Sequence, residues 1–330
     1  MRDILLDGPR VVVIGGGTGL SVLLGGLKGY TKNITAIVTV ADDGGGSGVL
    51  REDLGMLPPG DIRACMLALA NTEPTMERLF QYRFDNGMLK GQSFGNLFIA
   101  AMNGIYGSFE MAIKETSNVL AITGRVYPMT LEKVRLFAEL EDGKIVEGES
   151  NIPVIAQNRK SSIKRVFIDP KISNPLRESI EAIEEADLIV LGPGSLYTSV
   201  IPNLLINDIV DKIYRSKAPK VYICNVMTQP GETDGYDLLD HVEAILRHSR
   251  PDLLDYVIGN IEEIPEGILN KYITDGSTPV LLKDEHRNTL RNIGIDTIEE
   301  NLIDIKKNYI RHDNIKLSQL LMDICREEIN

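Results

Sequence analysis

The sequence predicts an α/β fold of the Rossmann-like, three-layer α/β/α type, with a mostly parallel sheet and a small antiparallel β insertion. Short apolar, β-branched runs such as Val11–Ile14 and Leu188–Leu191 alternate with stretches of helical character. These runs lack polar alternation, which is typical of parallel strands buried on both faces. Each run also ends in a loop rich in glycine and small polar residues.

The predicted strands follow one another along the whole chain. A helix follows the first strand through about Lys28, because the stretch after the glycines is apolar and compatible with a helix. The runs read as strands are Val11–Ile14, Ile34–Val40, Leu188–Leu191, Lys220–Cys224 and the weaker candidate Tyr256–Ile258.

One segment interrupts this alternation. Two apolar runs flank Asp142-Gly143, and a pair of strand-like runs around Asp-Gly is a hairpin signal. We therefore expect an antiparallel β-hairpin insertion over about 125–168. No linker rich in serine and glycine divides the chain, so residues 1–330 are predicted to form a single nucleotide-binding domain that carries this insertion.

Composition narrows the classes of function. The chain has 330 residues, 43% hydrophobic and 25% charged, with a net charge of −12. That charge argues against nucleic acid as a partner, because phosphate backbones need a basic footprint. No apolar run approaches the length of a membrane span. The three distant cysteines, Cys65, Cys224 and Cys325, are expected to be reduced core thiols of a cytoplasmic protein.

The first glycine-rich loop points to a phosphate. Glycines bring backbone N–H groups close to a ligand, and the start of a helix carries partial positive charge. A turn that serves only packing is the alternative. No Walker lysine follows, and the last glycine comes early for the usual NAD fingerprint. The candidate ligand-binding residues are Gly16, Gly17, Thr18 and Gly19.

The second loop carries two acids. Asp42 and Asp43 stand where a dinucleotide fold places its ribose-binding acid, and a carboxylate pair could also hold Mg²⁺. An Asx turn that opens the glycine loop is the alternative. Gly45 and Ser47 complete this group of candidates.

Two later loops are expected at the same edge of the sheet. After Leu188–Leu191, the backbone amides of Gly194 and Ser195, with Thr198 nearby, could hold a second anionic group, or Ser195 could simply cap a helix. In a parallel sheet the ends of strands meet at one edge, so the four loops together predict one ligand site. The remaining candidates from these loops are Gly192, Asn225, Thr228 and Gln229.

Polar residues at three helix starts are further candidates. Asp61 is expected to cap its own helix, and Arg63 reaches either a ligand phosphate or Asp43 unless it is a surface arginine. Ser93 and Asn96 precede a helix that is apolar all round, so they are caps or contacts to a base or sugar.

The histidines and hydroxyl groups give no catalytic pattern. His241, His248, His286 and His312 lack metal-ligand spacing, and the first two are expected to be solvated on a polar helix. No nucleophile–base pair can be placed from the spacings. The sequence thus indicates binding more strongly than catalysis.

Taken together, the loops resemble the YvcK-type gluconeogenesis factors, bacterial relatives of the 2-phospho-L-lactate transferase CofD. The resemblance is carried by Gly15-Gly16-Gly17-Thr18-Gly19, Asp42-Asp43-Gly44-Gly45-Gly46-Ser47-Gly48, Pro59-Gly60-Asp61, Ser93-Phe94-Gly95-Asn96, Gly192-Pro193-Gly194-Ser195-Leu196-Tyr197-Thr198-Ser199, Asn225-Val226-Met227-Thr228-Gln229-Pro230-Gly231-Glu232-Thr233 and Arg311-His312-Asp313.

The resemblance implies a cytoplasmic protein that is required for normal cell shape on gluconeogenic carbon sources. It implies binding of UDP-sugars, chiefly UDP-N-acetylglucosamine, and a link to cell wall precursor metabolism. It also suggests Tyr272 and Arg311 as contacts to the sugar nucleotide. The transferase branch of the family uses Mg²⁺ and an acidic pair that matches Asp42 and Asp43.

These expectations rank a non-catalytic, regulatory nucleotide-sugar-binding protein first. The alternatives are an Mg²⁺-dependent transferase of a phospho group, with Asp42 and Asp43 as catalytic residues, and an NAD(P)-binding oxidoreductase. Expected partners are UDP-N-acetylglucosamine or a related nucleotide, an unidentified enzyme of cell wall precursor synthesis, and further copies of the chain in a homo-oligomer.

Overall fold

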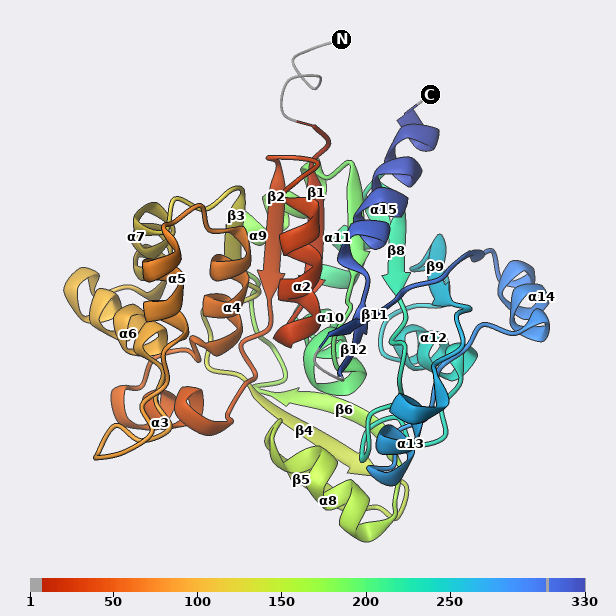
Figure 1. Ribbon diagram of the computed structural model, residues 1–330, viewed down its shortest axis with the longest axis horizontal. Coiled ribbons are helices and arrows are strands. Elements are labelled where there is room, and N and C mark those ends of the chain that lie inside the picture. The colour runs from red at the N-terminus through yellow and green to blue at the C-terminus, as the bar shows by residue number, and fades with distance from the viewer. Residues whose placement is uncertain (1–7, 307–308, 330) are drawn as a thin grey trace.

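A computed structural model describes residues 8–306 and 309–329 of the chain (Figure 1). Its centre is a seven-stranded sheet in the order β10-β9-β8-β7-β1-β2-β3, in which all neighbours run parallel. The strands are β1 (Val11–Gly15), β2 (Ile34–Val38), β3 (Arg125–Pro128), β7 (Leu188–Leu191), β8 (Lys220–Ile223), β9 (Tyr256–Asn260) and β10 (Asp296–Glu300). The predicted Rossmann-like α/β class is confirmed.

Strand β1 lies in the middle of the sheet, because it pairs with β2 on one side and with β7 on the other. Val11 is opposite Ile34 in one pairing and opposite Leu188 in the other. All five residues of β1 are buried, which explains why the first four, Val11–Ile14, are apolar and β-branched. Burying each such side chain contributes about 1.5–3 kcal/mol.

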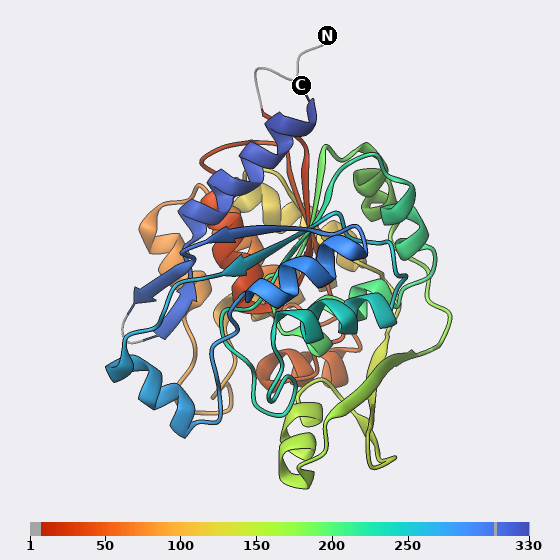
Figure 2. The same ribbon diagram turned by 90° about the vertical axis from the view of Figure 1, so that its right-hand side faces the viewer.

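Helices cover both faces of the sheet. Figures 1 and 2 show α2, α4 and α15 on one side and α9 and α11 on the other. Within residues 8–306 and 309–329, none of these helices is long and apolar enough to cross a membrane.

The helices are α2 (Gly17–Leu27), α3 (Gly45–Leu54), α4 (Gly60–Leu69), α5 (Pro74–Gln81), α6 (Phe94–Tyr106), α7 (Phe109–Val119), α8 (Asn151–Arg159), α9 (Arg177–Glu185), the π-helical η1 (Leu196–Val200), α10 (Ile201–Leu204), α11 (Ile209–Arg215), α12 (Leu238–Arg247), α13 (Glu266–Thr274), α14 (Asp284–Asn292) and α15 (Asn314–Ile329).

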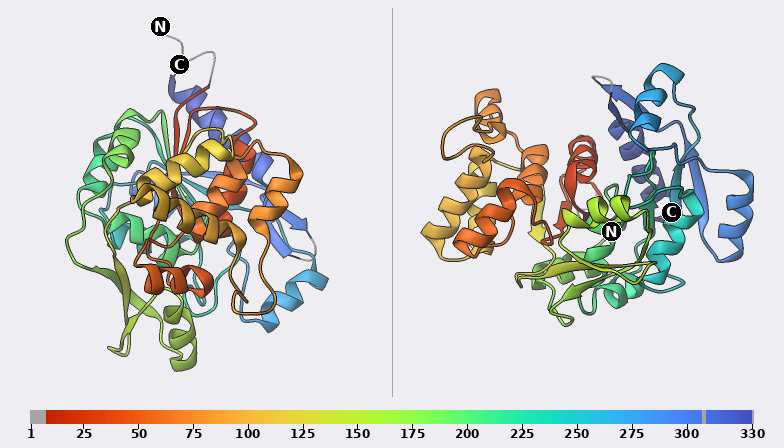
Figure 3. Two further views of the ribbon diagram at one scale, coloured as in Figure 1. Left: turned by 90° about the vertical axis from the view of Figure 1, so that its left-hand side faces the viewer. Right: turned by 90° about the horizontal axis from the view of Figure 1, so that it is seen from below.

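The insertion is a separate antiparallel sheet in the order β5-β4-β6, formed by β4 (Arg135–Leu140), β5 (Ile145–Glu147) and β6 (Ile163–Asp169). Together with α8 it lies below the carboxyl ends of the parallel strands (Figures 1 and 3). The expected boundary at residue 125 is wrong, because 125–128 form the edge strand β3 of the main sheet. The insertion also contains a helix, which the hairpin signal does not reveal.

The predicted central strands match the observed ones to within two residues. Strand β10 was not predicted, because Asp296–Glu300 has polar residues at an edge position and none of its side chains is buried. The three cysteines are buried and unpaired, as expected.

The end of the chain returns to its beginning. Strands β11 (Ile303–Lys306) and β12 (Tyr309–His312) form a two-stranded sheet, and α15 then packs across α2. Asp313 caps α15, because its Oδ1 accepts hydrogen bonds from the N–H groups of Ile315 and Lys316. A Cβ atom on Gly26 of α2 would lie only 2.4 Å from the carbonyl oxygen of Asn314. The start of α15 can therefore approach α2 this closely only because residue 26 is a glycine.

Two neighbouring glycines of α2 provide a matched test of this contact. We expect Gly26→Ala to lower the free energy of unfolding by about 1–3 kcal/mol, because the methyl group would push α15 away. Gly25→Ala should raise it by about 0.5–1 kcal/mol, because a Cβ there meets no atom within 4 Å and alanine favours the helix. Urea unfolding of both variants measures the difference. Equal stability of the two would contradict the tight helix contact.

Candidate functional site

The loops after β1, β2, β7 and β8 meet at the carboxyl edge of the sheet, where they surround two cavities. The first has a volume of about 300 Å³ and the second about 260 Å³. Both are bordered by Gly17 and Thr18, so the turn after β1 lies between them. The expectation that loops distant in the sequence share one edge is confirmed.

Two positions of the turn after β1 are packed too closely to tolerate a side chain. A Cβ atom on Gly16 would lie 2.6 Å from Oδ2 of Asp61, and one on Gly19 would lie 2.8 Å from the carbonyl oxygen of Pro193. Gly17 adopts φ +71°, a left-handed conformation that favours glycine. The glycines therefore let α4 and the loop after β7 approach the start of α2.

Asp61 has a different role from the predicted one. It lies inside α4 and does not cap that helix; its Oδ2 accepts the N–H of Gly17 at 2.7 Å, at the start of α2. Burial, and next the nearby charge of Asp42, raise the pKa of Asp61 to about 6. The first amide of the turn is thus already bound to a carboxylate of the protein.

Most predicted residues border one of the cavities, although ligand contact by any of them stays a prediction. The predicted residues at the first cavity are Gly16, Gly17, Thr18, Gly19, Gly194, Ser195, Asn225, Gln229, Tyr272 and Arg311. Those at the second are Gly17, Thr18, Asp42, Gly45, Ser47, Arg63 and Asn96.

Five predicted residues, including Gly192, are not among the residues that line either cavity. Asp43 accepts the N–H of Ser150, at 2.9 Å, from the insertion. The hydroxyl of Ser93 caps α6 by accepting the N–H of Asn96. Thr198 and Thr228 are buried and hydrogen-bonded to Glu232 and Thr278, respectively.

The C-terminal part of the chain closes the first cavity. Tyr272 of α13 accepts the N–H of Ile310 through its hydroxyl, at 2.8 Å, and this contact holds β12 beside the cavity. Arg311 of β12 lines the cavity and lies 5.7 Å from the ring centre of Tyr309. His312, not predicted as a site residue, borders the same cavity, and burial lowers its pKa to about 4.

The second cavity contains two arginines. Nε of Arg63 donates to Oδ1 of Asn96 at 2.8 Å, so both predicted residues belong to one contact. Arg83, which the sequence did not single out, borders the same cavity. Burial, and next the positive charge of Arg83, lower the pKa of Arg63. This pair is the cationic part of an otherwise acidic region.

Three carboxyl groups lie close together beside the second cavity. Glu149 of the insertion hydrogen-bonds to Asp42, and its pKa is raised to about 9 by burial and then by the charges of Asp42 and Asp61. Glu149 is therefore protonated at neutral pH. Sequence patterns did not reveal it, because the insertion brings it to Asp42 from 107 positions away.

Mg²⁺ at the acidic pair stays a prediction. Carboxylate oxygens suit this ion, yet no group of three His, Cys, Asp or Glu side chains in residues 8–306 and 309–329 is arranged to hold a metal. Oδ1 of Asp42 accepts the N–H of Gly44 at 2.8 Å, and Oδ1 of Asp43 is bound to Ser150. Any Mg²⁺ bound here would need water among its ligands.

The buried carboxylate of Glu232 binds the loop after β7. Glu232 is only 2% exposed and accepts the N–H of Tyr197, the hydroxyl of Thr198 and the side-chain amide of Gln229. The hydroxyl of Ser195 donates to Gln229 at 2.7 Å and makes no capping hydrogen bond. The alternative that Ser195 only caps a helix is therefore wrong.

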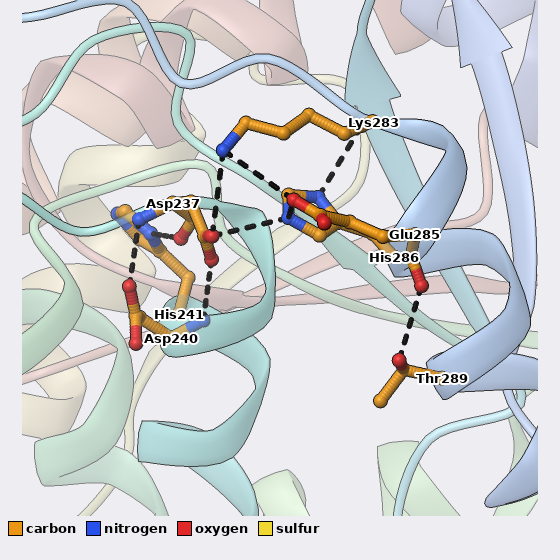
Figure 4. Close-up of polar contacts among 7 residues, drawn as sticks. All are labelled: Asp237, Asp240, His241, Lys283, Glu285, His286 and Thr289. Carbon is orange, nitrogen blue, oxygen red and sulfur yellow. Dashed lines mark hydrogen bonds and ion pairs between the residues drawn. The ribbon is translucent and has the colours of Figure 1, made fainter.

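A second polar cluster joins two helices away from both cavities (Figure 4). Asp237 caps α12, and its Oδ2 lies 3.1 Å from Nε2 of His286 and 3.9 Å from Nζ of Lys283. His241 in the same cluster is fully buried, so the expectation that it is solvated is wrong. These contacts fix α12 to α14, which explains why the polar residues are there.

The raised pKa of Glu149 predicts a dependence of stability on pH. The pKa of Glu149 is about 9 in the folded chain and near the ordinary 4.5 in the unfolded chain. Between pH 4.5 and pH 9 the folded chain therefore holds a proton that the unfolded chain has lost, and stability falls as the pH rises through this range. Glu149→Gln stays neutral. We expect it to raise the melting temperature by about 2–4 °C at pH 8 and much less at pH 5.

Glu147→Gln, at an exposed position of the same insertion, is the control. Thermal unfolding at both pH values measures each variant. A gain for Glu149→Gln of the same size at pH 5 and pH 8 would contradict a protonated Glu149.

Comparison with known proteins places this geometry in a family. A relative from Thermoanaerobacterium thermosulfurigenes, provisionally named a gluconeogenesis factor, is 60% identical over 319 residues, covering 97% of this chain and 98% of the relative. The gluconeogenesis factor of Bacillus subtilis is 49% identical over 320 residues, covering 97% and 99%. A crystal structure of a UPF0052 family protein from Bacillus halodurans matches with a TM-score of 0.90 at 50% identity, covering 94% and 98%.

The family model described as 2-phospho-L-lactate transferase CofD matches residues 11–303. This range includes every residue that lines the two cavities except those of strand β12. The chain therefore belongs to the CofD family, and within it is similar over nearly its full length to proteins named gluconeogenesis factor.

Proposed function

We propose that this protein is a cytoplasmic, regulatory nucleotide-sugar-binding protein that binds UDP-sugars of the UDP-N-acetylglucosamine type, with the nucleoside in the first cavity. The observation that carries the proposal is that the loops after β7 and β8 and Arg311 surround the turn of backbone donors after β1, with the loop after β2 at the adjoining second cavity. Thr18 and Gly19 are in the first turn of α2, where amides lack partners inside the helix and the dipole attracts an anion.

The arrangement of the cavities supports a ligand with two parts. A diphosphate placed at the start of α2 would lie between the first cavity, which would take the nucleoside, and the second cavity, which would take the sugar. Arg311 supplies positive charge in a chain whose net charge is −12. The proposal includes a regulatory role in cell shape and cell wall precursor supply, through a partner enzyme, which the resemblance to the YvcK-type factors implies.

A transferase of the 2-phospho-L-lactate type is the second candidate. Asp61, with a pKa of about 6, and Glu149, with a pKa of about 9, lie beside the second cavity. Acids with raised pKa values can accept and donate protons near neutral pH. Mg²⁺ at Asp42 would supply charge neutralisation for phospho-group transfer. NAD(P) stays a third candidate ligand of the turn.

Calorimetry with UDP-N-acetylglucosamine, NAD and GDP, each with and without Mg²⁺, separates these candidates. Binding of the UDP-sugar without Mg²⁺ and without turnover is the expected result. Formation of a product from a bound nucleotide would favour the transferase, and preferential binding of NAD would favour the third candidate.

Arg311 allows a direct test of the anion site. We expect Arg311→Ala to weaken UDP-N-acetylglucosamine binding by about tenfold to a hundredfold, because a charge-assisted hydrogen bond is lost. Arg177→Ala is the control, since Arg177 lies on α9 with its side chain 85% exposed and borders neither cavity. Equal affinity of the two variants, measured by calorimetry, would place the diphosphate elsewhere.

Gly17 tests the turn itself. Valine at φ +71° would be strained by about 1–2 kcal/mol and would cover the donors of the turn, so Gly17→Val should weaken nucleotide binding at least about tenfold while the fold is retained. Gly87→Val carries the same strain at φ +68° in a loop where a Cβ meets nothing within 4 Å. Circular dichroism and calorimetry compare the two, and retained binding by Gly17→Val would refute the site.

A further inference from the structure

The buried Glu232 fixes the direction of a chain of hydrogen bonds that ends at the first cavity. Its carboxylate oxygens lie 3.2 Å from the backbone N of Tyr197, 3.0 Å from Oγ1 of Thr198 and 2.7 Å from Nε2 of Gln229. All three partners can act as donors. An ionised carboxylate only accepts, so the set is complete when Glu232 is charged.

The donor–acceptor direction set by Glu232 also fixes the hydrogen bond between Gln229 and Ser195. Because the NH₂ group of Gln229 must face Glu232, its Oε1 faces the opposite way and lies 2.7 Å from Oγ of Ser195. An amide oxygen only accepts, so the Ser195 hydroxyl donates its single proton to Gln229. The lone pairs of Ser195 Oγ are then left for the cavity, which Ser195 and Gln229 both border.

A neighbouring residue has the same polarity. Nδ2 of Asn225 donates to the carbonyl oxygen of Gly194 at 3.0 Å, which leaves Oδ1 of Asn225 as an acceptor on the same wall. This acceptor wall, defined as Ser195 and Asn225, borders the same cavity as the turn after β1. An acceptor wall repels phosphate oxygens and attracts N–H and O–H groups.

Glu232 fills part of the start of η1. The N–H of Tyr197 and the hydroxyl of Thr198 there are bound to Glu232, a carboxylate that is only 2% exposed. The protein's own carboxylate therefore occupies Thr198, one of the groups that the sequence suggested for a ligand anion. Anion binding by the backbone amides of Gly194 and Ser195 stays a prediction.

We infer that the acceptor wall selects the hydrogen-bond-donating, non-phosphate part of the nucleotide sugar, its hydroxyl or N–H groups, and that Glu232 is the positioning residue that sets this preference through Gln229. The inference rests on the proposed function for the identity of the ligand. The chain Glu232–Gln229–Ser195 itself exists without ligand and can be tested alone.

The first arm of the experiment uses the ligand-free protein. With ¹⁵N-labelled glutamine, the side-chain amide signal of Gln229, identified by its loss in Gln229→Met, should move in both Glu232→Gln and Ser195→Ala. Glu243→Gln, at an exposed position of α12, should leave it in place. A Gln229 signal that is unchanged in both variants would overturn the hydrogen-bond chain, whatever the protein binds.

The second arm is a double-mutant cycle with UDP-N-acetylglucosamine, measured by calorimetry. Ser195→Ala and Glu232→Gln should each weaken binding about tenfold, and the double variant should be little weaker than either, because Ser195 already loses its orientation in Glu232→Gln. Gln229→Met replaces Glu232→Gln in the cycle if the latter does not fold. Independent losses, amounting to about a hundredfold in the double variant, would overturn the coupling.

The two arms separate the inference from the proposed function. Absence of UDP-N-acetylglucosamine binding by the unmodified protein contradicts the proposed function, while the NMR arm still decides the hydrogen-bond chain. Inorganic pyrophosphate serves as the phosphate probe. If Ser195→Ala weakened pyrophosphate binding as much as it weakened binding of the sugar nucleotide, the wall would contact phosphate and the inference would be wrong.

Discussion

The arrangement of the site depends on the close packing around Gly16 and Gly19. Asp61 approaches the turn from α4, and Pro193 approaches it from the loop after β7, each to a distance at which a Cβ atom would clash. This packing places the start of α2 between two cavities and exposes Thr18 to both. Because these close contacts of the backbone define the geometry of the turn, the turn presents N–H donors without basic side chains of its own, in a chain whose net charge is −12.

Buried carboxylates satisfy two backbone amides at this edge of the sheet. Asp61 accepts the N–H of Gly17, and Glu232 accepts the N–H of Tyr197. Burial raises the pKa of both, to about 6 and about 7, since each negative charge is removed from water. The two differ in surroundings: Asp61 borders a cavity, whereas Glu232 lies beneath a loop and reaches the cavity only through Gln229.

The sequence predicts the central strands well and the periphery less well. Strands β1, β2, β7 and β8 are buried on both faces, so continuous apolar runs mark them. The edge strand β10 has a polar sequence, and the helix of the insertion leaves no hairpin signal. Glycine loops likewise predicted where the cavities lie, because strand ends in a parallel sheet share one edge.

The side-chain partners at the site could not be predicted from spacing. Asp61 meets Gly17 across 44 positions, and Ser195 meets Gln229 across 34. Such pairs depend on the packing of whole elements, which local patterns do not encode. Asp61 resembled an ordinary helix cap for this reason, and Glu232 resembled a loop residue. Resemblance to a family suggested Tyr272 and Arg311 as contacts, since their own segments carry no glycine loop.

The return of β12 and α15 to the first strands has a consequence for biosynthesis. A ribosome releases β1, β2 and β3 first, whereas β12, which carries Arg311, follows every strand of the parallel sheet in the sequence. A nascent chain therefore has the glycine turn without its closing cation. Arg311 can therefore line the first cavity only after all seven strands of the parallel sheet have been synthesised.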